Sequence, residues 1–194
     1  IYRVRSYGFR GEALPSIAAI PRVEMVTRRE TYLSGTRTIV EAGQLEEIAD
    51  AGCPVGTSVW VSRIFDPVPV RKKFLKTEAT EQGHCLDVIT RIALSHPEVR
   101  IRVVVHGREI WSIPAAGDIF ERVSLVLGTD FMDQMLPVKG ARGSVTLEGF
   151  ASKPAYSKSN AKQLLFFINK RFIRDYLLNH AVMTTYRRLI EARK

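Results

Sequence analysis

The residues most able to do chemistry in this sequence lie in the stretch SYGFRGEALPSIAAI, residues 6–20. Gly8 and Gly11 stand directly before a run that predicts a helix, and glycine lets the backbone turn sharply and approach a ligand closely. Glu12 falls in the first expected turn of that helix, where a carboxylate suits the helix dipole. The free N–H groups of such a helix start can receive an anion, above all a phosphate. An ordinary glycine turn before an ordinary helix has the same spacing, so the spacing alone does not decide.

Other residue types that could do chemistry lack the spacing of a catalytic or metal site. The sequence holds no Walker loop, no G-x-S-x-G turn and no H-E-x-x-H helix. The acidic pair Glu46 and Glu47 is expected in a solvated polar loop. Cys53 and Cys85 form no C-x-x-C pair, so we expect two reduced thiols. The histidines are expected at the surface or in packing: His84, His96, His106 and His180. We therefore expect no catalytic residue and no metal ligand in this chain.

Composition and charge favour a globular protein with a polyanionic partner. The chain has 194 residues, of which 45% are hydrophobic, enough for one large domain or two small ones. Its net charge of +9 is uneven, since residues 1–97 hold 13 Lys and Arg against 11 Asp and Glu, and residues 98–194 hold 16 against 9. Such an excess favours nucleic acid, because phosphates release counterions on binding, although basic domains without that role are common.

The ends and the hydropathy of the chain also bear on its class. No apolar run approaches the roughly 20 residues that span a bilayer, and the first residues lack a signal-peptide pattern. We therefore expect neither secretion nor a membrane partner. The chain begins Ile-Tyr-Arg without an initiator methionine, so we expect it to be a piece of a longer protein.

Periodicity in the first half predicts strands followed by a helix. Strands are expected at residues 22–29, 35–43 and 56–65. Two prolines in the segment DPVPV end the third strand, because proline cannot continue a ladder. A helix follows, with an apolar face made by Leu86, Ile89, Ile92 and Ala93. The dipeptide His96-Pro97 ends it, and we place the domain boundary there, with domains at residues 1–97 and 98–194.

The second half restarts the mixture of strands and helices. The expected elements are a hairpin over residues 99–113, a helix over residues 118–128, a strand over residues 143–152 and, after a buried strand and a polar turn at residues 169–171, a helix from about Asp175. His106 and Gly107 suit the hairpin turn. Asp118 near the start of the first helix and Gly128 just past its end suit the two helix caps.

Four segments, in order, resemble motifs of the MutL family of DNA mismatch-repair proteins. The family's ATP-lid motif is matched by GFRGEAL, residues 8–14, and its G-T-x-V strand by GTSVWVSRIF, residues 56–65. Its P-A-R-R-K-F-L-K-x-x-x-x-E segment resembles PVRKKFLKTEATE, residues 69–81, and its F-V-N-x-R-x-[IV]-R-D stretch resembles FFINKRFIRD, residues 166–175. The matches cover nearly the whole chain, and the lid motif is specific.

The resemblance implies an α+β fold: the rear half of a Bergerat-type ATPase sandwich, as in gyrase, heat-shock chaperones, histidine kinases and MutL, followed by a βαβ transducer domain. In that fold the lid closes over ATP, and its backbone N–H groups hold the phosphates. The lid glycines would give freedom to close, Phe9 an apolar plug, and Arg10 a charge near the phosphates or a strut for the closed lid. The implied nucleotide-binding residues are Gly8, Phe9, Arg10, Gly11, Glu12, Gly56 and Thr57, of which the last two border the pocket.

Some parts of the family's site have no match in this sequence. The catalytic glutamate and the metal-holding asparagine lie on an early helix, and the nucleotide-specifying aspartate lies in a D-x-G-x-G turn; all precede the lid. The lysine that reaches the γ-phosphate lies in a later N-V-H-P-x-K segment. We therefore expect ATP and magnesium to bind the intact protein, and this chain alone neither to bind them tightly nor to hydrolyse ATP. Pro67 and Val68 also replace the family's Asn-Thr pair, which leaves the hydrogen bonds of that loop open.

For DNA, the resemblance places basic residues at Lys73 and Arg91, and Arg71, Lys72 and Lys76 add charge beside the first. These side chains would contact phosphates of double- or single-stranded DNA and supply affinity without reading sequence. A solvated helix start with one buried aliphatic stem is the plain structural alternative.

Together these expectations describe a mismatch-repair protein. It would bind ATP, close as a homo- or heterodimer around DNA, and link a mismatch-recognition protein of the MutS type to strand incision, in the bacterial cytoplasm at the nucleoid or in a eukaryotic nucleus. Two alternatives stay open. One is a non-catalytic nucleic-acid-binding module whose glycine turn only precedes a helix. The other is a topoisomerase-type ATPase and transducer fragment, whose motifs fit GFRGEAL and NKRFIRD less well.

Overall fold

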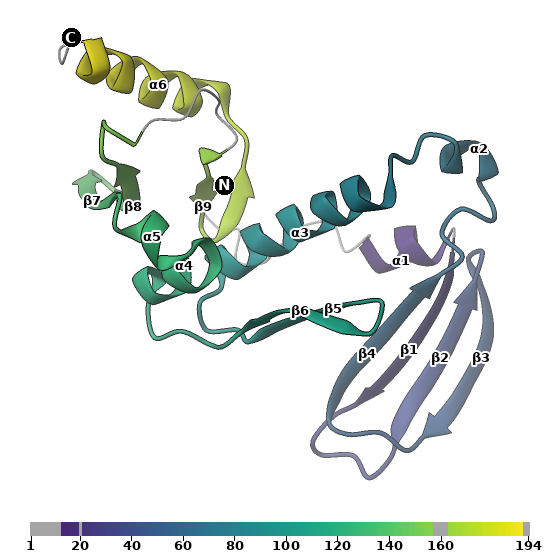
Figure 1. Cartoon of the computed structure of the whole chain (residues 1–194). Helices are drawn as coiled ribbons and strands as arrows, with labels where there is room; N and C mark the ends of the chain where they lie inside the picture. The colour runs from purple at the N-terminus through teal and green to yellow at the C-terminus, as the bar shows by residue number, and fades with distance from the viewer. Residues whose placement is uncertain (1–12, 20, 157–162, 192–194) are drawn as a thin grey trace. The chain divides into compact units, whose positions relative to one another are not determined.

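The structure, a computed structural model, describes residues 13–19, 21–156 and 163–191 (Figure 1). The chain divides into two compact units, Ile1–Glu81 and Gln82–Lys194. Most of the long helix α3, Glu78–Ser95, goes with the second unit, because its residue Leu94 joins the core of that unit. The division into domains after residue 97 stays a prediction.

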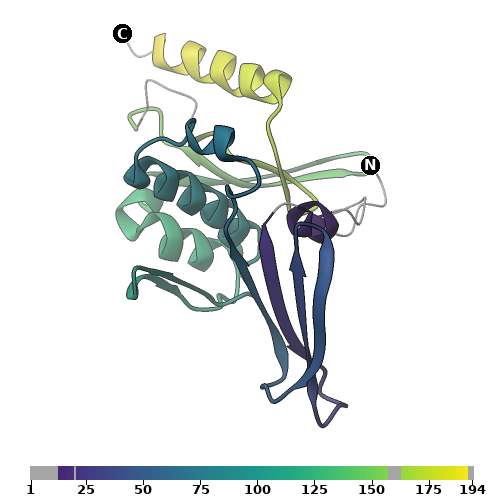
Figure 2. The ribbon, with the colours of Figure 1, turned by 90° about the vertical axis from the view of Figure 1, so that its right-hand side faces the viewer.

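The first unit is built on one four-stranded antiparallel sheet with the order β3-β2-β1-β4, whose strands lie side by side in Figures 1 and 2. The strands are β1, Arg22–Arg28; β2, Gly35–Glu41; β3, Gln44–Ala51; and β4, Gly56–Ser62. Three of them confirm the strands that the sequence predicts. The solvated loop expected at Glu46 and Glu47 is wrong, because these residues belong to β3.

The missed strand β3 is explained by its turn and by its composition. Ala42 and Gly43 connect β2 to β3 with φ angles of 49° and 80°, the left-handed pair typical of a two-residue hairpin. An Asn-Gly pair would have signalled this turn, whereas Ala-Gly does not. The sequence QLEEIADA is acidic and mostly exposed, so its alternation is weak. Glu47 nevertheless holds its place through an ion pair with Arg37 on β2 at 3.3 Å.

One face of this sheet is charged. Arg37 lies between two carboxylates, with its Nε 2.8 Å from Glu24 on β1 and its Nη1 3.3 Å from Glu47 on β3. The hydrogen bond from Arg37 lowers the pKa of Glu24, and the same bond raises the pKa of Arg37. Opposite charges on neighbouring strands stabilise the pairing register of β1, β2 and β3.

Three helical elements accompany the sheet in the first unit. They are α1, Ala13–Ala18, the short helix α2, Pro69–Lys72, and the first turn of α3. Pro69 occupies the first turn of α2, where its missing N–H costs nothing. The start of α3 is held by Glu81, whose side chain accepts the backbone N–H of Lys76 at 2.9 Å.

The second unit contains three two-stranded antiparallel sheets and several helices. The sheets pair β5, Ile101–Val105, with β6, Arg108–Ile113; β7, Met135–Arg142, with β8, Val145–Ser152; and β9, Phe166–Ile168, with β10, Arg171–Ile173. Apart from the part of α3 within it, its helices are α4, Ile119–Leu127; α5, Thr129–Met132; and α6, Tyr176–Glu191. This mixture of antiparallel sheets and helices confirms the α+β class.

Most predicted elements of the second unit are confirmed. His106 and Gly107 form the hairpin turn with φ angles of 48° and 76°. Asp118 caps α4 by accepting the N–H of Glu121 at 2.8 Å, and Gly128 follows that helix with φ 94°. Strands β7 and β10 were not predicted. The polar turn is therefore one residue shorter than expected, because Arg171 already belongs to β10.

The core of the second unit is small and has a buried cation beside it. Leu94, Val123 and Met132 form the buried hydrophobic cluster. Arg122, next to Val123 on α4, is 0% exposed. Its Nη2 donates to the carbonyl oxygens of Pro97 and Val99, the latter at 2.6 Å. These carbonyls lie just past the end of α3, where the helix dipole favours a positive charge. Arg122 therefore fixes the connection between α3 and β5.

Candidate functional site

The predicted ATP lid lies outside the described residues. Its residues are Gly8, Phe9, Arg10, Gly11 and Glu12. The described part begins with α1, Ala13–Ala18, so the helix expected directly after the second lid glycine is confirmed. The phosphate-binding role of the lid stays a prediction.

Gly56 and Thr57, the other predicted nucleotide-binding residues, begin strand β4 at its pairing with the end of β1. Gly56 has φ 127°, a backbone conformation that favours glycine, and a Cβ at this position would meet nothing within 4 Å. The Thr57 hydroxyl shares a 2.7 Å hydrogen bond with the hydroxyl of Thr27 on β1. This turn is open and exposed, so a ligand can approach its backbone closely.

Gly56 and Thr57 do not by themselves make up a nucleotide pocket. They offer backbone groups and a hydroxyl, which suit hydrogen bonds to a nucleotide. Within residues 13–19, 21–156 and 163–191, no group of three His, Cys, Asp or Glu side chains is arranged to hold a metal ion. The described part therefore offers no such cluster for a magnesium ion.

The predicted DNA-binding cations of the first unit lie together in the α2 segment, residues 69–76. All four are exposed, and none forms an ion pair with another described residue: Arg71, Lys72, Lys73 and Lys76. Phe74 and Val70 are exposed between them, at 75% and 64%. The nearby carboxylates are engaged elsewhere, since Asp66 binds Arg63 at 2.8 Å. The segment therefore presents uncompensated positive charge around an aromatic ring.

Arg91, the predicted DNA-binding residue of the second unit, is in a different situation. Its Nη2 lies 2.5 Å from Asp87, one turn earlier on α3, and its side chain is only 19% exposed. Its guanidinium also lies 4.5 Å from the centre of the Phe172 ring on β10. The ion pair and the ring position Arg91 within the second unit. Its charge is thus partly used by the protein itself.

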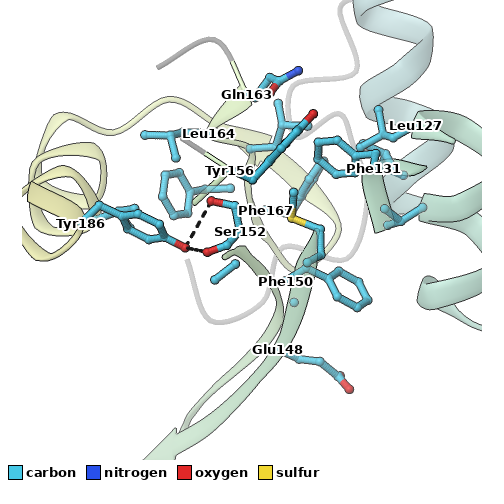
Figure 3. A pocket seen from close by; sticks show the side chains of 18 of the residues that line it. Leu127, Phe131, Glu148, Phe150, Ser152, Tyr156, Gln163, Leu164, Phe167 and Tyr186 are labelled. Carbon is cyan, nitrogen blue, oxygen red and sulfur yellow. Dashed lines mark hydrogen bonds between the residues drawn. The ribbon is translucent and has the colours of Figure 1, made fainter. Parts of the chain in front are cut away.

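The sequence did not predict a cavity of about 680 Å³ within the second unit (Figure 3). Its walls come mainly from apolar residues of α4, α5, β8, β9 and α6, including Phe131, Phe150 and Phe167. Tyr186 on α6 reaches across to Ser152 on β8, donating to its carbonyl oxygen at 2.5 Å (Figure 3). The run of apolar residues at 164–168 predicts a buried strand. The pattern does not show that this strand lines a cavity.

This cavity is a poor candidate for a phosphate site. Arg187 is the one cation among its described lining residues, and Glu148 adds a negative charge. Phosphate recognition needs several N–H donors or cations, which apolar walls do not supply. We therefore do not place the nucleotide there.

The chain is similar to DNA mismatch-repair proteins of known sequence. A family model described as DNA mismatch repair protein, C-terminal domain, matches residues 123–194. The curated DNA mismatch repair protein MutL of Syntrophus aciditrophicus (strain SB) is 57% identical over 194 residues, which are 100% of this chain and 32% of that protein. MutL of Geobacter sulfurreducens is 38% identical over 191 residues, 98% of this chain and 31% of that protein. The chain thus spans about a third of the length of these relatives.

The chain is also similar to solved structures of DNA repair proteins. The Aquifex aeolicus MutL ATPase domain complexed with ADP matches with a TM-score of 0.75 and 30% identity, covering 93% of this chain and 72% of that chain. A crystal structure of the N terminal domain of a DNA repair protein matches with a TM-score of 0.79 at 23% identity, covering 94% of this chain and 61% of that one, and supports the fold alone. Among the described helices, none has both the length and the hydropathy to cross a membrane.

Proposed function

The chain belongs to the MutL family of DNA mismatch-repair proteins, and we propose that the whole protein is an ATP-gated coupling factor of DNA mismatch repair. In this proposal it binds ATP, dimerises around DNA, and links a mismatch-recognition protein of the MutS type to strand incision. The observation that carries the proposal is the 57% identity to a curated MutL over all 194 residues. The ADP complex of the Aquifex aeolicus domain supports a nucleotide as its ligand.

The nucleotide-binding part of the proposal rests on glycines at two places. Gly8 and Gly11 precede α1 directly, so their backbone N–H groups would hold phosphates beside a helix start. Gly56 leaves room for close approach at the start of β4. Magnesium, when bound, neutralises charge on the nucleotide phosphates. The chain's own residues bind and enclose the nucleotide, and they contribute no catalytic base that we can name.

The coupling follows from a difference in binding between two arrangements. A ligand shifts a conformational equilibrium only by its differential affinity for the two states. A lid that is ordered by ATP and released after hydrolysis supplies such a difference. The protein would therefore report its nucleotide state through the arrangement of its domains.

DNA binding is assigned chiefly to the α2 segment. Its cations are exposed and unpaired within the described part, so they are available for phosphates: Arg71, Lys72, Lys73 and Lys76. Arg91 is proposed to contribute less, because Asp87 and Phe172 already hold its guanidinium. Contacts of this kind give affinity for double- and single-stranded DNA without sequence preference.

The test of this function is ATP binding by the whole protein after Gly11→Val. A branched side chain restricts the backbone that must close on the phosphates. We therefore expect the affinity for ATP to fall by about tenfold or more, the scale of one lost hydrogen bond to a charged group. Equilibrium binding of a fluorescent ATP analogue measures it. Gly83→Ala is the matched control, because a Cβ at Gly83 within α3 meets nothing within 4 Å.

The outcome separates the proposed function from its alternative. A non-catalytic nucleic-acid-binding module would keep its DNA affinity and show no ATP binding in either form. Full ATP affinity in Gly11→Val would remove the lid from the phosphate site and contradict the proposal.

A further inference from the structure

We propose that Phe74 is a base-stacking residue and that the α2 segment, residues 69–76, is a site for single-stranded DNA. In this site the ring of Phe74 lies against an unpaired base while the neighbouring cations hold the phosphates on either side. The inference rests on the proposed DNA binding and adds to it a residue that distinguishes single strands from duplex.

The first observation is the exposure of the ring. Phe74 is 75% exposed, more than any other phenylalanine among the exposed large hydrophobic residues. No aromatic ring and no cation stacks on it within the described part of the chain, whereas Phe172 of the second unit is covered by Phe167 and Arg91. The face of this ring is therefore open to stacking by a flat group from outside the chain.

The second observation is the local geometry of the backbone. The N–H of Phe74 donates to the carbonyl of Arg71 at 3.1 Å, and the N–H of Lys73 donates to that of Val70 at 3.3 Å. In a turn closed by such bonds between residues three apart, these two residues lie on the same side of the chain. The ring of Phe74 therefore shares one side with Arg71.

The third observation is that this positive charge is uncommitted. Glu81, the carboxylate at the start of α3, accepts the backbone N–H of Lys76 at 2.9 Å rather than pairing with its ammonium. Asp66 is held by Arg63 at 2.8 Å. The cations of the α2 segment thus keep their charge for an external anion, and regularly spaced phosphates provide one.

A ring among cations fits a single strand better than a duplex. Non-specific binding of single strands combines a positive groove with aromatic side chains on which bases stack. In a duplex the bases are already stacked on each other and only their edges face the grooves. Phe74 would therefore add affinity only where a base is free, and the cations would add affinity to both forms.

The experiment measures the binding of two DNA forms by five variants of the full protein. Fluorescence anisotropy measures binding of an oligo(dT) strand and of a duplex of equal length at several salt concentrations. Phe74→Ala and Phe74→Leu should lose about tenfold in affinity for the single strand, as expected for one stacked base, and change duplex affinity little. Phe74→Trp should retain the single-strand affinity, because it keeps a flat π face. Val70→Ala, which removes exposed apolar area without removing a ring, is the matched control and should change neither.

The charge variant separates this inference from the proposed function. Lys73→Glu should weaken both DNA forms and lower the salt dependence of both by about one unit or more. If Lys73→Glu changes neither affinity nor salt dependence, the assignment of DNA binding to this segment fails. If Lys73→Glu behaves as expected and the Phe74 variants lose nothing on the single strand, or lose as much on the duplex, the stacking role is overturned while DNA binding stands. If Phe74→Leu binds the single strand as tightly as Phe74→Trp does, the contact is apolar and not a stacked ring. That result would also overturn the stacking role.

Discussion

The cations of the α2 segment in the first unit and two arginines of the second unit, Arg91 and Arg122, carry the same charge in opposite circumstances. The α2 cations are exposed and form no ion pair with a described residue. Arg91 is 19% exposed, is paired with Asp87 and lies over Phe172. Arg122 is 0% exposed and donates to two backbone carbonyls. Residues 98–194 have the larger basic excess, yet Arg122, which is part of that excess, serves the structure of its own unit.

The net charge of a sequence includes every charged residue, whereas DNA binding depends on the cations that have no partner within the protein. A cation that already has a carboxylate, a ring or carbonyls must give them up before it gains a phosphate. A cation in water loses only hydration and side-chain freedom. Substitutions should therefore lower stability in the second unit and lower DNA affinity in the α2 segment.

The largest effect is expected for Arg122. Arg122→Ala removes a wholly buried side chain, leaves a cavity and leaves the carbonyl of Val99 without its donor. We expect the free energy of unfolding to fall by about 2–5 kcal/mol, as for large-to-small changes in a core. Urea denaturation followed by circular dichroism measures this loss.

Arg122→Met sharpens the same point, because methionine restores apolar volume without a charge. Two nitrogens of Arg122, Nε and Nη1, find no acceptor in the described part of the chain, so the buried guanidinium carries a desolvation cost. We expect Arg122→Met to recover part of the loss. A methionine variant at least as stable as the original protein would mean that this charge does not serve the structure, and it would break the comparison.

Much of the fold was predictable because most elements have strong local signals. The strands around Val23 and Val59 alternate, Asp118 and Gly128 mark the ends of α4, and His106 marks a hairpin. Strand β3 has weak alternation, and β7 and β10 owe their assignment to a partner strand, which a local pattern does not contain. Pairing between strands depends on tertiary structure, and it overrides a weak local β-strand propensity.

The candidate site was predictable only as a set of residue types. The basic cluster around Lys73 follows from the sequence, but its freedom from carboxylates depends on where Asp66 and Glu81 direct their oxygens. Arg91 has the same type and the same predicted role, and its partner Phe172 lies far away in the sequence. No pattern in the chain announces that contact.

A smaller effect is expected for Arg91. Arg91→Lys keeps the charge and an i,i+4 ion pair with Asp87, and it loses the planar contact of the guanidinium with Phe172. We expect the free energy of unfolding to fall by about 0.5–1 kcal/mol. The salt dependence of DNA binding should stay unchanged, because the charge remains.

Arg91→Ala is the companion variant. It should lower stability by a similar amount and change the salt dependence less than Lys73→Ala, which removes an uncommitted charge. If Arg91→Ala lowers the salt dependence by about one unit, as a phosphate contact would, Arg91 binds DNA directly and the contrast between the two regions is lost.

The smallest effect is expected for Glu98, whose ion pair with Lys170 is exposed to solvent. Glu98 accepts from the Lys170 ammonium at 3.0 Å and contacts the His96 ring at 2.8 Å. Its own backbone N–H, the His96 ring and the Lys170 ammonium together lower the pKa of Glu98 to about 2. Because the pKa is lower in the folded state, this stabilisation is complete above the ordinary pKa of a glutamate and is lost as the pH falls towards 2.

Glu98→Gln should therefore lower the melting temperature slightly at neutral pH, and the difference from the original protein should shrink between pH 4.5 and pH 2. Added salt should also reduce it, since exposed pairs are screened. Melting curves at several pH values measure the difference, with Glu30→Gln as the control because Glu30 is exposed and has no ion pair in the described residues. If the difference in melting temperature grows towards acid pH, the charged carboxylate of Glu98 is unfavourable in the folded state. Lys170 would then count, like the α2 cations, as a charge without a stabilising partner.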